Sequence, residues 1–271
     1  MTPIDEIRVA LFVPGDRPDR FEKAYSSGAD LVIIDLEDAV PRPGKAAARD
    51  HVEAWLGSGH RAAVRINGTE TAAYSDDIQM LRRTSPTAVV LPKAEPEGVA
   101  RLVAEAPLSL PVIALVETAS GVLRAHETCS ISGVVRAALG HLDLSAELGC
   151  DPYSSTISTA ADMLVLASAT AGLAGPLDGV CTDIDDDARL QLECDRAKQR
   201  GCTGKLVVHP RQVPFVRDSF RPRADEVEWA RRVLTSAQDG SVFRLDGRMV
   251  DEPVLRRARR ILEQPRSGTA R

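Results

Sequence analysis

The sequence lacks the features of membrane-anchored and secreted proteins. None of its hydrophobic runs reaches the roughly 18 consecutive apolar residues that a membrane-spanning helix requires. Residues 1–6 lack the positive charges and following apolar stretch of a secretory signal. The five cysteines, at positions 129, 150, 181, 194 and 202, are irregularly spaced and form no C-x-x-C pair, which argues against a disulfide framework or a structural zinc site. We therefore expect a reduced, cytoplasmic protein with no membrane partner.

The sequence also lacks a strong excess of charge of one sign. It contains 34 Lys and Arg against 39 Asp and Glu, which gives a formal net charge of −5. The basic residues are scattered, so we expect no extended nucleic-acid surface. A local positive pocket for a phosphate-bearing small molecule is compatible with this balance.

Eight short apolar runs recur along the first part of the chain. They are rich in leucine and β-branched residues without apolar/polar alternation, which predicts strands buried on both faces. The runs are residues 9–13, 31–36, 61–66, 88–91, 112–116, 134–139, 179–181 and 206–208. Helix candidates between them are residues 20–26, 45–55, 71–83, 97–104, 120–126, 154–171 and 188–200. Eight such units predict a closed (β/α)8 TIM barrel, and the absence of G-x-G-x-x-G argues against an open dinucleotide-binding sheet.

The pattern changes after residue 220. Residues 224–238 predict a helix, residues 242–245 a short extended segment, and residues 253–263 a final helix, with a frayed tail over 264–271. A turn sequence, Asp239-Gly240, separates the first helix from the extended segment. We expect a barrel over residues 1–220 and a C-terminal extension over residues 221–271. The extension could serve as a lid over a barrel mouth, either its own or a neighbour's.

Polar residues follow the predicted strands, where a barrel builds its active site. Glu117 and Asp143 follow two adjacent strands, so their carboxylates should converge at the mouth. Two carboxylates with open positions for water and substrate oxygens form a common Mg²⁺ site. The alternative is that each residue caps the helix that follows it. The nearby Arg65 favours the metal site.

Arg65 ends an apolar strand, where a guanidinium needs a partner. Its planar fork suits a substrate carboxylate or an enolate oxygen. The structural alternative is a salt bridge to Glu37 or Glu95. Glu37 and Asp38 follow the preceding strand and are predicted either to support Arg65 or a metal-bound water, or simply to form ion pairs at the rim.

Several other polar features carry less weight. The acidic run at residues 183–187 precedes a predicted helix, so we expect helix capping rather than a metal cluster. Ser145 lacks the G-x-S-x-G context of a hydrolase nucleophile. Lys93 suits a buried ion pair as well as a Schiff base. The histidines without a partner at metal-binding spacing, predicted to be surface or packed residues, are His51, His60, His126 and His141.

Eight motifs in order along the chain resemble the citrate lyase β-subunit-like (CitE-like) branch of the HpcH/HpaI aldolase superfamily. They are residues 12–17 (FVPGDR), 36–40 (LEDAV), 65–67 (RIN), 91–95 (LPKAE), 116–119 (VETA), 143–149 (DLSAELG), 204–212 (GKLVVHPRQ) and 246–253 (DGRMVDEP). Each motif is short, and their common order carries the resemblance. One departure is Phe12, which stands where some acyl-CoA lyases have a tyrosine.

The resemblance implies a cofactor, a substrate and roles for individual residues. It implies Mg²⁺ held by Glu117 and Asp143, with Arg65 on the substrate carboxylate and carbonyl region. Positions that match coenzyme A contacts in the acyl-CoA lyases are Lys23, Lys45, Val208 and His209. Asp251 matches an acid/base on a C-terminal lid that reaches the site of an adjacent subunit, so a homotrimer or hexamer is expected. Local sequence alone instead makes Asp251 a helix cap, since it lies two residues before Pro253.

These observations predict a Mg²⁺-dependent carbon–carbon lyase. Its expected substrates are 3-hydroxyacyl-CoA thioesters of the malyl, citramalyl or hydroxymethylglutaryl type, which yield an acyl-CoA and an oxo-acid. The alternatives are a carrier-protein-dependent citrate lyase subunit, an aldolase acting on free acids, and a non-catalytic protein that binds coenzyme A or organic acids. A phosphoryl-transfer barrel is disfavoured because no glycine-rich phosphate-binding loop is present.

Overall fold

The computed structural model describes residues 2–237 and 242–263. The chain divides into two compact units, Met1–Phe220 and Arg221–Arg271. Three features predicted above lie outside the described residues: the tail at 264–271, the Asp239-Gly240 turn and the last residue of the helix expected over 224–238.

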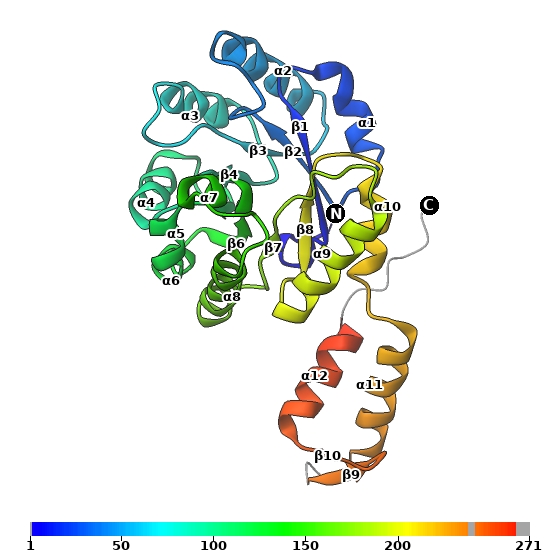
Figure 1. Ribbon diagram of the computed structural model, residues 1–271. Coiled ribbons are helices and arrows are strands. Elements are labelled where there is room, and N and C mark those ends of the chain that lie inside the picture. The colour runs from blue at the N-terminus through cyan, green and yellow to red at the C-terminus, as the bar shows by residue number, and fades with distance from the viewer. Residues whose placement is uncertain (1, 238–241, 264–271) are drawn as a thin grey trace. The chain divides into compact units, whose positions relative to one another are not determined.

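The first unit is a closed barrel of eight strands in sequence order (Figure 1). Every neighbouring pair is parallel, including β8 with β1, so the barrel closes on itself. The strands are β1 Val9–Pro14, β2 Leu31–Asp35, β3 Ala63–Arg65, β4 Val89–Leu91, β5 Val112–Val116, β6 Val134–Leu139, β7 Leu177–Asp178 and β8 Gly204–Val207. The predicted (β/α)8 architecture is confirmed.

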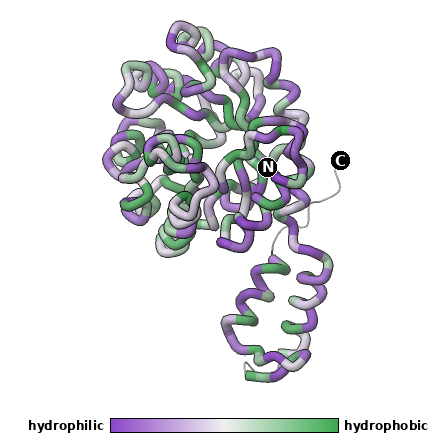
Figure 2. Tube along the Cα trace, in the orientation of Figure 1, coloured by the Kyte–Doolittle hydropathy of each residue, from purple (hydrophilic) through white to green (hydrophobic). Residues whose placement is uncertain are grey.

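Helices surround the strands. The α-helices of this unit are α1 Phe21–Tyr25, α2 Lys45–Gly57, α3 Tyr74–Arg83, α4 Pro96–Glu105, α5 Ala119–Leu123, α6 Ala125–Cys129, α7 His141–Leu148, α8 Ser155–Thr170, α9 Asp187–Arg200 and α10 Gln212–Ser219. Short 3-10 helices precede β1, α1 and α2 at Ile4–Glu6, Pro18–Arg20 and Arg42–Gly44. Figure 2 shows hydrophilic and hydrophobic residues alternating along these helices, as expected when one face packs on the barrel.

Two predictions of local structure were wrong, and two short helices were missed. The helix expected at 120–126 is two short helices, α5 and α6, because Arg124 leaves the helical conformation (φ −106°, ψ 15°). The strand expected at 179–181 lies earlier, because Leu177 and Asp178 are the residues that pair with β8. The short helices α7 and α10 were not predicted.

The barrel interior is filled by one face of the strands. Because side chains alternate along a strand, every second residue points inward. The buried interior cluster contains Ile7, Ala10, Leu31, Ile33, Ala63, Ala88, Val90, Ile113, Leu115, Ala138, Leu177 and Leu206. Arg136 lies below this cluster on β6, is fully buried, and donates to the carbonyls of Ile4, Asp5 and Ile7. These contacts close the N-terminal end of the barrel and leave the opposite end for function.

The second unit is a small helical hairpin with a two-stranded sheet. It contains α11 Ala224–Ser236, β9 Phe243–Leu245, β10 Arg248–Val250 and α12 Glu252–Glu263, with β9 and β10 antiparallel. Its core consists of Ala230, Val233, Val250, Leu255 and Ala258. In both units, none of the described helices has the length and apolar character needed to cross a bilayer.

Candidate active site

The strand alternation that fills the barrel interior also delivers charged groups to its C-terminal end. On three strands the interior residue is followed, two positions on, by a charged residue with the same inward direction. These pairs are Ile33 and Asp35, Ala63 and Arg65, and Leu115 and Glu117. The three charged groups therefore meet above the apolar interior, as the barrel geometry predicts.

Arg65 is held by carboxylates from β2 and the loop after it. Its Nε and Nη2 donate to the two carboxylate oxygens of Asp35 at 2.7 and 2.6 Å, and its Nη1 lies 3.0 Å from Glu37 Oε2. The guanidinium carbon lies 4.9 Å from the centre of the Phe12 ring. Burial opposes the charge, but the hydrogen bonds and charges of Asp35 and Glu37 outweigh it, so the pKa of Arg65 is raised. The expected partner Glu37 is confirmed, while Glu95 does not pair with Arg65.

Glu117 is a buried carboxylate at the end of β5. Its side chain is almost fully buried (2% exposed), and its Oε1 accepts from the backbone N–H of Lys93 at 2.9 Å. Lys93 has a positive φ of 48°, an uncommon conformation that directs this N–H to the carboxylate. Burial, followed by the charges of Glu37 and Asp143, raises the pKa of Glu117 to about 8. The metal-free site thus strongly disfavours the ionised form.

Asp143 faces Glu117 from the first turn of α7. It is exposed, it lines the same cavity as Glu117, and its charge contributes to the raised pKa of Glu117. Neither residue caps a helix. Thr118, not Glu117, caps α5 by accepting from the N–H of Gly121, and the N-cap of α7 is Gly140, with no side-chain bond. The capping alternative is therefore wrong for both residues.

Glu117 and Asp143 open into one cavity of about 430 Å³ at the barrel mouth. The predicted residues that line it are Arg65, Glu117, Asp143, Asp38 and Val208. Its other lining residues include Asp35, Phe12 and His141, and an apolar wall formed by Leu115, Leu139, Val180 and Leu206. The cavity therefore joins a charged floor to an apolar side, as small-molecule sites commonly do.

The donor set of this cavity fits a hard divalent cation. Within residues 2–237 and 242–263 no cluster of three or more Asp, Glu, His or Cys residues has metal-binding geometry. The mouth cavity contains the carboxylates of Glu117 and Asp143. Such a pair is typical of Mg²⁺, which keeps water and substrate oxygens as its other ligands. A cation would also relieve the repulsion among Glu117, Glu37 and Asp143 that raises the pKa of Glu117. In addition, Glu37 Oε2 is buried without a well-formed hydrogen bond.

The two lysines near the mouth, Lys93 and Lys45, donate hydrogen bonds to residues just after β2. Lys93 Nζ donates to Glu37 Oε1 at 2.8 Å, so the structure shows the ion pair that the sequence allowed. Lys45 Nζ donates to the carbonyls of Leu36 and Glu37 at 2.7 and 2.9 Å. Burial lowers the pKa of Lys45. Both lysines thus fix the loop that carries Glu37.

The remaining residues predicted to bind coenzyme A are spread around the same end of the barrel and on α1. Val208 is exposed and lines the mouth cavity. His209 follows it, and its Nδ1 accepts from the N–H of Arg211 at 3.2 Å. Lys23 is exposed on α1 and is not among the residues that line the cavity. Their role in binding coenzyme A stays a prediction.

Asp251 belongs to the second unit and precedes α12. Its Oδ1 accepts from the backbone N–H of Val254 at 3.3 Å, which is the capping contact expected from its local sequence. This contact involves one of the two carboxylate oxygens, so capping does not exclude an acid/base role. The latter stays a prediction.

The other polar motifs have structural roles. Asp186 in the acidic run caps α9 by accepting from the N–H of Arg189 at 2.8 Å, as predicted. Ser145 is buried and donates to the carbonyl of Leu142. The five cysteines are free thiols.

Two residues of the mouth were not identified from the sequence. Asp35 was hidden inside an apolar run, although a lone carboxylate in a buried strand signals a charged partner. The sequence predicts a surface or packed histidine at 141, and the structure shows a buried histidine that lines the mouth cavity. Burial, then the charge of Lys205, lowers the pKa of His141.

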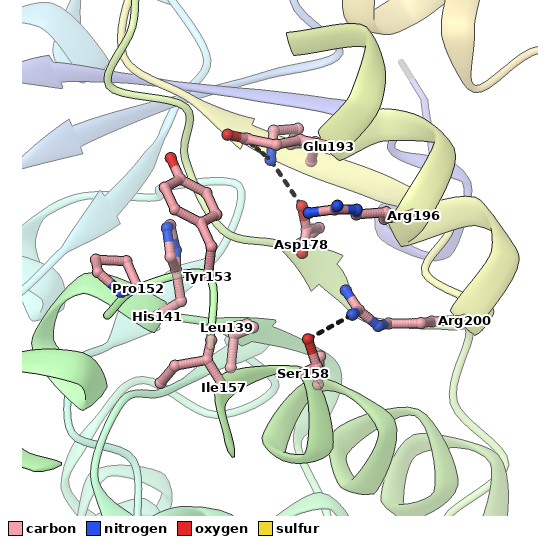
Figure 3. Close-up of a pocket in the computed structure, with 12 residues that line it drawn as sticks. Leu139, His141, Pro152, Tyr153, Ile157, Ser158, Asp178, Glu193, Arg196 and Arg200 are labelled. Atoms are coloured by element: carbon pink, nitrogen blue, oxygen red, sulfur yellow. Dashed lines mark hydrogen bonds and ion pairs between the residues drawn. The ribbon is translucent and has the colours of Figure 1, made fainter. Parts of the chain in front are cut away.

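A smaller cavity of about 50 Å³ lies behind His141, between the strands and the outer helices (Figure 3). His141 and Tyr153 lie on one side of it, and Asp178, Glu193 and Arg196 lie on the other. Lys205 is buried there and pairs with Asp178 at 2.7 Å and Glu193 at 3.0 Å. Although burial opposes the charge of this lysine, the two carboxylates raise its pKa.

Comparison with known proteins agrees with this arrangement. Residues 8–210 match the family model HpcH/HpaI aldolase/citrate lyase. The chain is 39% identical over 269 residues, 96% of both chains, to the citrate lyase subunit beta-like protein of Mycobacterium tuberculosis. It is 32% identical over 270 residues to the (3S)-malyl-CoA thioesterase of Cereibacter sphaeroides, covering 94% of this chain and 93% of that protein.

A solved structure shares both the fold and much of the sequence. The crystal structure of CitE from Mycobacterium tuberculosis, in complex with magnesium, acetoacetate and coenzyme A, superposes with a TM-score of 0.84 and 37% identity. The match covers 96% of this chain and 99% of that one. The expected enzyme class, a carbon–carbon lyase, is confirmed at the level of the family. The chain belongs to the HpcH/HpaI aldolase/citrate lyase family.

Proposed function

We propose that this protein is a Mg²⁺-dependent carbon–carbon lyase acting on 3-hydroxyacyl-CoA thioesters. Its substrates would be of the malyl, citramalyl or hydroxymethylglutaryl type, cleaved to or formed from an acyl-CoA and an oxo-acid. The observation that carries the proposal is the pair Glu117 and Asp143, which opens into the mouth cavity beside a fixed Arg65. The related CitE structure with magnesium, acetoacetate and coenzyme A supports the same ligand classes.

Each group has a part in the bond cleavage. Glu117 and Asp143 would hold Mg²⁺, which when bound would supply Lewis-acid stabilisation to the oxo-acid oxygens. The substrate hydroxyl passes its proton to the carboxylate of Asp251 as the carbon–carbon bond breaks, and the carbon that carried the hydroxyl becomes the carbonyl of the oxo-acid. The electron pair of that bond passes to the thioester, where Arg65 donates to the developing enolate oxygen. Asp35 and Glu37 fix the guanidinium beforehand, so little reorganisation is needed during the reaction.

The enolate must then gain a proton at carbon, and we assign this step to Asp251 as a carboxylic acid. We also assign Lys23, Lys45, Val208 and His209 to coenzyme A. Glu37 and Asp38 lie beside Arg65 and would support it, together with a water on the metal when one is bound. Delivery of Asp251 by a neighbouring copy would make a homotrimer or hexamer the active form, which light scattering on the purified full chain tests.

The experiment is a cleavage assay on the purified chain without added protein. Malyl-CoA, citramalyl-CoA and hydroxymethylglutaryl-CoA would be supplied with Mg²⁺ and then with EDTA. Metal-dependent release of an acyl-CoA and an oxo-acid is the expected result. Absence of cleavage of all three would contradict the proposal. Turnover only with an acyl-carrier protein would instead favour a citrate lyase subunit, and turnover only of free acids would favour an aldolase.

Thioester hydrolysis is a second candidate function, favoured by the similarity to a (3S)-malyl-CoA thioesterase. The products separate the two reactions. Cleavage of malyl-CoA gives acetyl-CoA and glyoxylate, whereas hydrolysis gives malate and free coenzyme A. Chromatography of the coenzyme A species from one reaction therefore distinguishes a lyase from a thioesterase.

A further inference from the structure

His141 lies where the two cavities described above approach each other. It is the first residue of α7, directly after Gly140 and two residues before Asp143. Its side chain is 7% exposed, and it lines both the mouth cavity and the smaller cavity behind it (Figure 3). The imidazole is thus part of the wall that a ligand held by Glu117 and Asp143 would meet.

The fold reserves space for this ring at the end of β7. A Cβ atom on Gly179 would lie 2.1 Å from His141 Nδ1, 2.8 Å from Cε1 and 3.0 Å from Cγ. Gly179 does not adopt a positive φ, so the requirement for glycine arises from space rather than from backbone conformation. All three nearest atoms belong to His141, so Gly179 serves as a seat for the imidazole.

The ring lacks a hydrogen-bond partner among the residues that the structure describes. Its aromatic neighbour is Tyr153, whose ring centre lies 6.2 Å away in a tilted arrangement. A nearly buried imidazole normally has its nitrogens paired with protein or water. The surrounding wall of the mouth is apolar, formed by Leu139, Val180 and Leu206. On its other side the imidazole is close enough to Lys205, Asp178 and Glu193 for their charges to act on it. His141 therefore lies between this charged cluster and the apolar side of the mouth.

We propose that His141 hydrogen-bonds an oxygen of the oxo-acid half of the substrate and so helps to determine which oxo-acids the site accepts. This inference rests on the proposed function. The oxo-acid half is favoured because His141 shares the first turn of α7 with Asp143, while Gly140 directly before it abuts the carboxylate of Glu117. The ligand class is an anion with a carboxylate or carbonyl oxygen within reach of a ring N–H.

The test measures binding rather than turnover. Glyoxylate, pyruvate and oxaloacetate are each titrated by calorimetry into the Mg²⁺-loaded full chain, and free coenzyme A is titrated separately. We expect His141→Ala to weaken the binding of at least one oxo-acid by about tenfold or more. Binding of coenzyme A should stay within about twofold of the wild type. His141→Gln, which keeps a side-chain N–H donor and much of the volume, should restore most of the lost affinity.

Gly179 provides a second, independent variant. Gly179→Ala should weaken oxo-acid binding when His141 is present, because the added methyl displaces the ring. It should have little further effect in the His141→Ala background, where the space is open. The non-additivity of this double-mutant cycle is the signature of a seat for the imidazole. His126→Ala, which removes an exposed histidine from α6, is the matched control.

The outcomes separate this inference from the proposed function. Oxo-acid affinity that is unchanged in His141→Ala, while the wild type cleaves CoA thioesters, overturns the role of His141 alone. Weakened oxo-acid binding with rescue by His141→Gln supports the role of His141 even if the wild type cleaves none of the thioesters. A wild type that binds none of the three oxo-acids overturns both. Additive effects in the double-mutant cycle overturn the seat formed by Gly179.

Discussion

Replacing Glu117 with glutamine should stabilise the metal-free protein while removing its affinity for Mg²⁺. Glu117 is buried, and burial together with Glu37 and Asp143 raises its pKa from 4.5 to about 8. Glutamine keeps the shape of the side chain and the oxygen that accepts from the N–H of Lys93. It removes the charge that the folded state disfavours and the ligand that the metal needs.

The direction of the pH dependence follows from proton binding. Between about pH 4.5 and 8 the folded protein keeps a proton on Glu117 that the unfolded chain has released, so the free energy of unfolding falls as the pH rises. One pH unit corresponds to about 1.4 kcal/mol. The ionisable Glu117 therefore costs roughly 3 kcal/mol at pH 7 and on the order of 4–5 kcal/mol above pH 8, as upper limits.

Mg²⁺ should reverse this loss in the wild type. The cation binds the ionised carboxylate, so its stabilising effect grows as the pH approaches 8 and increases with the ratio of its concentration to its Kd. The glutamine variant should show neither effect. The substitution should thus increase stability and abolish function, as is common when an active-site charge is removed.

The assay is urea unfolding of the full chain, followed by circular dichroism at about pH 6 and about pH 8, with EDTA or with Mg²⁺. In EDTA the midpoint of Glu117→Gln should exceed that of the wild type, and the difference should widen at the higher pH. Glu70→Gln, at an exposed glutamate of the first unit, is the control. If the difference in urea midpoint between Glu117→Gln and the wild type did not change with pH, the raised pKa of Glu117 would be refuted.

Three further substitutions test other parts of the site. Gly140→Ala places a Cβ 2.3 Å from Glu117 Oε2. Calorimetry should show a Mg²⁺ affinity at least about tenfold lower, and urea unfolding should show a free energy of unfolding lower by about 1–3 kcal/mol. Unchanged Mg²⁺ affinity would contradict the close packing of Gly140 on Glu117. Arg65→Lys loses the two hydrogen bonds to Asp35, so kcat/KM in the cleavage assay should fall about 100-fold or more. A fall of less than about threefold would argue against a catalytic role for Arg65. Lys205→Ala leaves buried Glu193 and half-buried Asp178 without their cation, so urea unfolding should show a cost of about 3–5 kcal/mol with Mg²⁺ affinity retained. A neutral effect would contradict the ion-pair assignment.

The strands and long helices of the barrel could be predicted because each has a strong local pattern. Buried parallel strands give short, continuous apolar runs, and a (β/α)8 barrel repeats them at regular intervals. The helix α7 escaped prediction because it has eight residues and buries only His141, Leu144 and Ser145. Such a short helix has too few apolar residues to show a helical period. It is nevertheless the element that positions Asp143.

The site could be predicted only in part, because the sequence locates the strand ends but not the contacts between their side chains. Glu117, Asp143 and Arg65 could be located because parallel strands bring their C-terminal ends to one rim. The partners expected for Arg65 were Glu37 or Glu95, and its bidentate partner Asp35 was missed because the register of β2 against β3 decides the geometry. A sequence pattern identifies which strand ends are polar, whereas the pairing of individual side chains depends on inter-strand register.

Contacts that are possible only because a glycine has no side chain are harder still to predict. Gly140 and Gly179 would be interpreted as turn residues, yet neither has a positive φ. Gly140 leaves room for the carboxylate of Glu117, and Gly179 leaves room for the imidazole of His141. The space at residue 179 is used by a side chain 38 positions earlier, so local sequence contains no signal of it.

The charge balance of the mouth gives these contacts a common consequence. Four carboxylates line the cavity, from Asp35, Asp38, Glu117 and Asp143, against a single guanidinium, that of Arg65. Glu37 and Lys93 form an adjacent pair of opposite charge. Asp35 is paired with Arg65 and Glu117 keeps its proton up to about pH 8, so an organic anion meets repulsion mainly from Asp38 and Asp143. A divalent cation between Glu117 and Asp143 would remove most of this repulsion, so an anionic substrate is expected to bind after the metal rather than before it.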